Sequence, residues 1–181
     1  WLNDNLKVVH VTDKCAEVTN GYYLIRIPHS GMPVEDFPVV PGMGNGTAAD
    51  MLIPGDALAA AGKGLEKGCM PVLQTIHVGT GPDGMAVLTT TDLESAAVRP
   101  VKMPEGTFPP LDKVIPKAKP LVSFGMDAGY LKKLCAFAEK HGGGSTLEFH
   151  VTDAESGLRL EFSVGGDPGR RAVMVLMPKR F

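Results

Sequence analysis

The chain repeats one sequence pattern, and this repeat constrains the fold more than any other feature. A short apolar strand runs into a helix capped by aspartate, then into a strand containing His-Val, then into a hairpin. The capping residues Asp56 and Asp127 are 71 positions apart, and His77 and His150 are 73 apart. A near-constant period indicates that one supersecondary unit has been duplicated.

A partial third copy opens the chain, because 8–13 (VVHVTD) is similar to 149–153 (FHVTD). The pattern predicts strands at 7–12, 16–19 and 22–27. Asn20-Gly21 predicts a two-residue type I′ turn, which needs positive φ at both positions. The Pro- and Gly-rich stretch 28–50 is interpreted as a flexible linker. Its glycine cluster is not a phosphate cradle, since no helix follows it directly.

The two full copies predict a βαβββ unit each, whose first short apolar strand lies at 52–54 (LIP) in one copy and at 122–124 (VSF) in the other. Asp56 is the expected N-cap of the first helix, which Gly68 ends, and Asp127 is the expected N-cap of the second, which a Gly-Gly-Gly run at 142–144 ends. The strands expected after the helices lie at 72–78, 85–90 and 96–101, and at 146–152, 158–164 and 172–177. Packing of both helices on antiparallel sheet predicts an α+β fold.

The expected organisation has three segments. Residues 1–46 hold the first strands and the loop, 47–118 the first unit with a proline-rich connector, and 119–181 the second unit. Residues 47–181 are expected to form one domain.

Composition excludes several classes of protein. A net charge of −2 gives no overall attraction to nucleic acid or to an anionic membrane, so DNA contact would need a local basic face. No apolar run is long enough for a membrane span and no signal segment is visible. Cys15, Cys69 and Cys135 form no CxxC pair, and they are interpreted as reduced thiols of a cytoplasmic protein.

No catalytic or metal-binding motif is present in the sequence. His10, His77 and His150 recur on separate predicted strands, which duplication explains without a shared metal. Walker, HExxH and nucleophile-elbow motifs are absent. We therefore expect a protein that is not an enzyme, without cofactor or metal. An enzyme of unrecognised class remains the third alternative.

Several segments resemble the bacterial DNA sliding clamp, the β subunit of DNA polymerase III. Residues 108–116 (FPPLDKVIP) resemble the segment that joins two clamp domains, and 175–181 (VLMPKRF) resemble its C-terminal strand. Residues 19–24 (TNGYYL) resemble its Thr-Asp-Gly-His-Arg-Leu hairpin, and 91–94 (TDLE) a related turn. The resemblance implies a DNA-clamp-like fold of duplicated units. A full clamp protomer has three domains, whereas this chain has about one plus part of another.

In the clamp these segments line a pocket for short apolar peptides of polymerases and repair proteins. The resemblance carries this role to Thr19, Gly21, Tyr22, Leu24, Pro109, Val114, Met177 and Pro178, with Arg180 and Phe181 flanking them. Taken one by one, the same residues are a turn, a linker and a core strand. The His-Arg of the clamp hairpin is Tyr22-Tyr23 here, so the peptide preference is expected to differ.

The resemblance also implies helices that face duplex DNA and contact its phosphates without reading bases. The candidate residues lie opposite the apolar stripes of the predicted helices: Lys63, Lys67, Lys132, Lys133 and Lys140. A solvated helix face is the alternative reading, since Glu66 and Glu139 dilute the charge.

Two functions follow as hypotheses. The first is a sliding-clamp-like processivity factor in DNA replication or repair, which binds partner peptides and encircles DNA only as a homo-oligomeric ring. The second is a clamp-fold interaction module that does not bind DNA.

Overall fold

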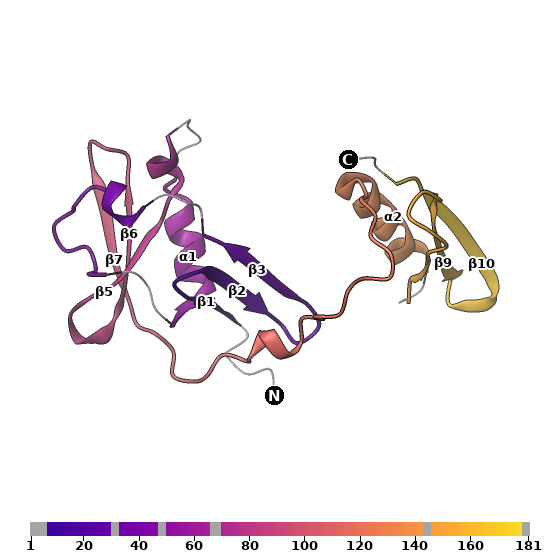
Figure 1. The fold of residues 1–181 in the computed structure, drawn as a ribbon, viewed down its shortest axis with the longest axis horizontal. Coiled ribbons are helices and arrows are strands. Elements are labelled where there is room, and N and C mark those ends of the chain that lie inside the picture. The colour runs from indigo at the N-terminus through magenta and orange to yellow at the C-terminus, as the bar shows by residue number, and fades with distance from the viewer. Residues whose placement is uncertain (1–6, 30–32, 47–49, 66–69, 143–145, 179–181) are drawn as a thin grey trace. The chain divides into compact units, whose positions relative to one another are not determined.

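The computed structural model describes residues 7–29, 33–46, 50–65, 70–142 and 146–178 (Figure 1). The chain divides into two compact units, Trp1–Ile115 and Pro116–Phe181, which are described separately below. Within the described residues, no helix has both the length and the apolar character needed to cross a bilayer.

The first unit opens with an antiparallel meander of β1 (Val8–Val11), β2 (Cys15–Thr19) and β3 (Leu24–Pro28). These strands confirm the ones expected from the sequence, with small shifts at their ends. The fourth strand of this sheet, β4 (Met51–Pro54), pairs with β1 and gives the order β3-β2-β1-β4.

The core of the first unit lies on one face of this sheet. Val11 and Met51 lie directly opposite each other on β1 and β4 and so share one face, and the helix α1 (Gly55–Gly62) contributes Ala61 to the cluster. Ala86 and Leu88 from a second sheet complete it, and all five side chains are buried. The helix is thus held between two sheets.

Two expectations about α1 are wrong. The N-cap of the helix is Pro54 and not Asp56. Asp56 lies inside the first turn, where its Oδ1 accepts a hydrogen bond of 2.8 Å from the N–H of Ala57. The helix ends at Gly62 instead of Gly68, which lies outside the described residues. Gly62 and Gly64 lie two positions apart at this point of the sequence. Glycine loses more backbone freedom on folding than other residues and therefore destabilises a helix, so the helix ends here.

The second sheet of this unit has the order β5-β6-β7. Its strands are β5 (His77–Thr80), β6 (Ala86–Thr91) and β7 (Ala96–Val101). The strand expected at 72–78 is wrong over its first half, because Pro71–Gln74 form a 3-10 helix. Pro71 fixes φ and has no N–H to offer a ladder, so a helical first turn suits it.

Residues 33–46, the strap, are not the flexible linker expected from the sequence. Phe37 is only 3% exposed, and its ring centroid lies 5.2 Å from that of His77. Asn45 and Thr80 exchange two backbone hydrogen bonds of 2.8 and 3.0 Å. A Cβ on Gly44 would lie 2.5 Å from the backbone of Gly79, so glycine is required for this close approach. The strap therefore packs on β5.

The second unit consists of α2 (Ala128–His141) and a sheet of order β10-β9-β8. Its strands are β8 (Glu148–His150), β9 (Leu158–Val164) and β10 (Asp167–Leu176). Asp127 caps α2 as expected, since its side chain accepts from the N–H groups of Gly129 and Tyr130. The apolar stripe of α2 packs on Leu158, Leu160 and Leu176.

The strand expected at 122–124 is not formed. Pro120 precedes this segment, and Val122 and Phe124 are 39% and 38% exposed. Met126, just beyond it, joins the core between α2 and the sheet. The second unit thus has the order αβββ among its described residues.

In each unit one helix precedes a three-stranded antiparallel meander, β5-β6-β7 in the first unit and β8-β9-β10 in the second. The first strand of each of these meanders carries a histidine, and so does β1, the first strand of the meander that opens the chain. The fold is therefore α+β, as expected, while the duplication stays a prediction. Because β4 joins the sheet of β1–β3, residues 1–46 belong to the same compact unit as 47–115. Residues 47–181, which are expected to form one domain, are divided between the two units.

Candidate peptide-binding surface

The turn at 19–23 is built by side chains that bond to its own backbone. The hydroxyl of Thr19 donates to the carbonyl of Tyr23 at 2.8 Å and accepts from the N–H of Gly21 at 3.2 Å. The Oδ1 of Asn20 accepts from Tyr22 and Tyr23, each at 3.0 Å. This turn leaves Tyr22 95% exposed at its tip.

The two-residue type I′ turn expected here is wrong. Gly21 has φ +87°, but Asn20 is not among the described residues with positive φ, and β3 starts only at Leu24. Four residues therefore close this hairpin, because the Asn20 side chain holds two backbone N–H groups that a tighter turn would pair differently.

The first unit brings the hairpin and the proline-rich connector together. Leu24 packs against a buried cluster that includes Phe108 and Leu111 of the connector. Pro109 lies exposed between those two residues, and Val114 is 66% exposed beyond a short 3-10 helix, Leu111–Lys113. Six of the predicted residues thus lie in two adjoining segments of one unit.

A chain of charged groups fastens the connector to the sheet. Glu17 is buried at 5% exposure, and its carboxylate accepts from the Nε of Arg26 and lies 3.0 Å from the Nδ1 of His10. Arg26 also donates to Asp112 of the connector at 2.8 Å. The bonds to Asp112 and Glu17 raise the pKa of Arg26. The ring of His10 stacks on Phe108 with centroids 4.6 Å apart.

Met177 and Pro178 belong to the second unit. Met177 follows β10 and is 66% exposed, and its Sδ lies 3.2 Å from where a Cβ on Gly157 would stand. Arg180 and Phe181 lie outside the described residues.

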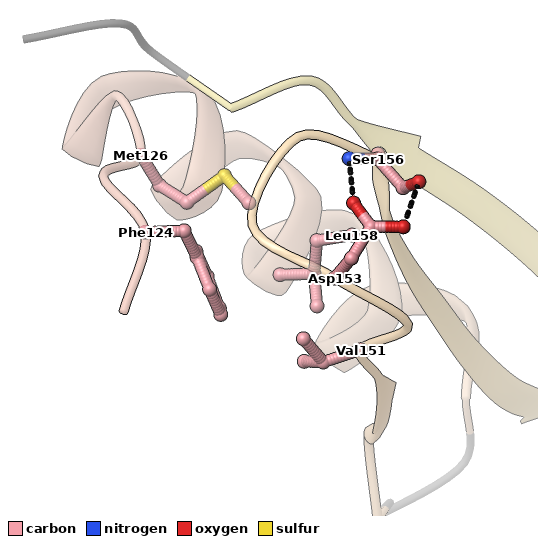
Figure 2. Close-up of a pocket in the computed structure, with 7 residues that line it drawn as sticks. Phe124, Met126, Val151, Asp153, Ser156 and Leu158 are labelled. Carbon is pink, nitrogen blue, oxygen red and sulfur yellow. Dashed lines mark hydrogen bonds between the residues drawn. The ribbon is translucent and has the colours of Figure 1, made fainter. Parts of the chain in front are cut away.

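The second unit also has a small, shallow surface groove that the sequence did not predict (Figure 2). Figure 2 shows apolar side chains around this space and a polar turn at its rim, where Asp153 binds the N–H and hydroxyl of Ser156 at 2.6 Å each. These bonds lower the pKa of Asp153. The lining residues are Phe124, Met126, Val151, Asp153, Ser156, Gly157 and Leu158. Gly157 lines the groove and also lies next to Met177. The groove was missed because 122–124 was assigned to a strand.

The predicted DNA-facing lysines that are described are exposed. On α2, Lys132, Lys133 and Lys140 lie opposite Leu131 and Leu134, which pack on the sheet. The Nζ of Lys133 lies 5.3 Å from the centroid of the Tyr130 ring. Lys63 follows α1 in the first unit, and Lys67 lies outside the described residues.

One group of possible metal ligands was also missed by the sequence analysis. Glu148, His150 and Glu161 have ligand atoms within 4.8 Å of one another, on β8 and β9. Arg171 already bonds to Glu148 at 2.6 and 2.9 Å and to Glu161 at 3.1 Å. The pKa of Glu148 is lowered mainly by Arg171. The arrangement is therefore best described as an ion-pair network that a guanidinium neutralises.

No family model matches the chain, and no curated protein matches it either.

Proposed function

We propose that this chain is a sliding-clamp-like accessory protein of DNA replication or repair, acting in the cytoplasm. It binds short apolar peptides of partner proteins and associates with duplex DNA without sequence preference. Encircling a duplex requires several copies of the chain arranged in a homo-oligomeric ring, with the lysine-bearing helices toward the DNA.

The packing of the hairpin on the connector carries this proposal. Leu24 packs against the buried cluster that contains Leu111, while Tyr22 in the hairpin turn and Val114 after the 3-10 helix of the connector are exposed. Exposed aromatic and aliphatic groups next to a rigid turn suit the capture of a short apolar peptide. The clasp from Arg26 to Asp112 keeps both segments in one arrangement, so less ordering is needed when a peptide binds.

The second candidate is a peptide-binding module of the same fold that does not bind DNA. Glu139 on α2 and the net charge of −2 favour it, because both oppose the approach of a phosphate backbone. The two candidates share the peptide surface and differ in DNA binding.

The peptide surface is tested with a displayed library of short apolar and aromatic peptides, and Kd values of selected peptides are then measured by fluorescence anisotropy. We expect Tyr22→Ala to weaken binding about tenfold or more, since exposed aromatic anchors dominate such contacts. Tyr130→Ala is the matched control, because Tyr130 is 58% exposed on α2 and outside the proposed surface. Equal Kd values for wild type and Tyr22→Ala would refute this site.

A further inference from the structure

The strap covers the outer face of the sheet β5-β6-β7. Neighbouring residues on a strand face opposite sides, so Leu88 points into the core of the first unit while Thr89 points outward. His77 lies directly opposite Thr89 and shares this outer face. Phe37 packs on His77, and Gly42 lies 3.8 Å from Val98 on β7, measured from an ideal Cβ. The strap therefore seals a small second core.

Two polar atoms inside this second core have no hydrogen-bond partner among the described residues. They are the Nδ1 of His77 and the hydroxyl of Thr89. His77 is 7% exposed and Thr89 is fully buried. Burial penalises the charged imidazolium, and it lowers the pKa of His77 below its ordinary value of 6.5.

Among the residues that the structure describes, no charged side chain is hydrogen-bonded or ion-paired to His77. On β7, Arg99 is paired with Leu88, faces the core side and donates to the carbonyl of Ala60. The strap carries Glu35 and Asp36, but both are exposed, and neither has a described hydrogen bond to His77. From β6 the facing group is the uncharged Thr89.

We propose that the strap is a proton-operated cover, which protonation of His77 releases from the outer face of the sheet. The strap docks on neutral His77 through the ring of Phe37. An imidazolium between Phe37 and Thr89 is buried away from water and faces no carboxylate among the described residues, so the released state, where the ring is hydrated, gains in population. Release uncovers Val87 and Val98, and gives the first unit an apolar surface at acid pH only.

The sign of the effect follows from proton linkage. The docked state has the lower pKa at His77, so it binds fewer protons than the released state when the pH falls below about 6.5. Docking is therefore at full strength above that value and weakens as the pH falls toward the lowered pKa. This inference is independent of the peptide and DNA functions.

Amide hydrogen exchange of the full chain, followed by NMR, tests the cover. The reporters are the amides of Asn45 and Thr80, whose two mutual bonds tie the strap to β5. We expect their protection factors, corrected for intrinsic exchange, to fall several-fold from about pH 7.5 to about pH 5. The amide of Leu88 on β6 should keep its protection, which separates release of the strap from global unfolding.

Two variants sharpen the test. In His77→Leu the strap should stay protected at both pH values, because leucine cannot be protonated. In His150→Leu, which alters the histidine on β8 of the second unit, the wild-type response should persist. Unchanged protection in the wild type at low pH, or an equal loss in His77→Leu, overturns the proposal. If His77→Leu does not fold, the wild type decides, since the Phe37 ring signals must then shift with the same midpoint as the His77 imidazole.

Discussion

The hydroxyl groups of Thr89 and Thr91, two positions apart on β6, have opposite effects on stability. Thr91 donates to the carbonyl of Ser95 at 2.8 Å and accepts from the N–H of Leu93 at 2.9 Å. Thr89 is fully buried, and its hydroxyl has no hydrogen-bond partner among the described residues. A buried hydroxyl without a partner lowers the free energy of unfolding, whereas one with two partners raises it.

These two threonines give a matched pair of substitutions. We expect Thr89→Val to raise the free energy of unfolding of the first unit by about 1 kcal/mol, because valine keeps the shape and removes the unpaired group. Thr91→Val should lower it by about 1–2 kcal/mol, since the N–H of Leu93 loses its acceptor and the carbonyl of Ser95 loses one of its two donors. Urea denaturation of both variants measures the difference. A loss of stability in Thr89→Val as large as in Thr91→Val would contradict this reading.

Among the elements, the cap of α2 is predicted correctly from the sequence, whereas the cap of α1 and the type of turn at Asn20-Gly21 are not. The Thr-Asp pair at 91–92 and the similar pair at 152–153 carry the same Asp-to-backbone bonds as Asn20, with the acceptor reaching the N–H groups two and three residues ahead. These bonds are local, so they follow from the residue types alone. The bonds from Ser95 likewise lower the pKa of Asp92.

The cap of α2 yields a prediction at this scale. Asp127→Ala should destabilise the second unit by about 1 kcal/mol, because two N–H groups at the start of the helix lose their acceptor. Asp56→Ala is the comparison in α1, where the side chain bonds only to the next residue, and a smaller loss is expected. Exchange rates of amides in the first turn of each helix report the effect. Equal losses in both helices would show that Asp127 has no special role as a cap.

Other elements could not be derived from the sequence, for a physical reason. The strap has no periodic pattern of apolar residues, so nothing local shows that Phe37 is buried against β5. The pairing of β4 with β1 is likewise decided by long-range contacts. For the candidate site, the connector and hairpin are identified by resemblance, whereas the ion pair between Arg26 and Asp112 joins residues 86 positions apart that no sequence pattern relates.

At the scale of the whole molecule, DNA binding separates the two candidate functions. The double variant Lys132→Glu with Lys133→Glu should lower affinity for duplex DNA and reduce the slope of log K against log salt, by about 0.9 for each lost phosphate contact. Lys117→Glu with Lys119→Glu, in the exposed connector, is the control of equal charge. Fluorescence anisotropy over a salt series measures both. If the wild type does not bind duplex DNA at low salt, the interaction module without DNA function is the better description.

The strand β4 also has a consequence for the time course of folding. The first sheet is complete only when β4 pairs with β1, which brings Pro54 opposite Val8 and Met51 opposite Val11. The strap belongs to the long segment between β3 and β4, so this segment has to close as a loop before β4 can pair. The meander β8-β9-β10 pairs only strands that are neighbours in sequence. Closing a long loop costs more conformational entropy than closing a short one, and this cost arises before the contacts that offset it can form. Chains rich in local contacts therefore fold faster. The second unit, although it follows the first in the chain, is therefore the part expected to reach its native pairing in fewer steps.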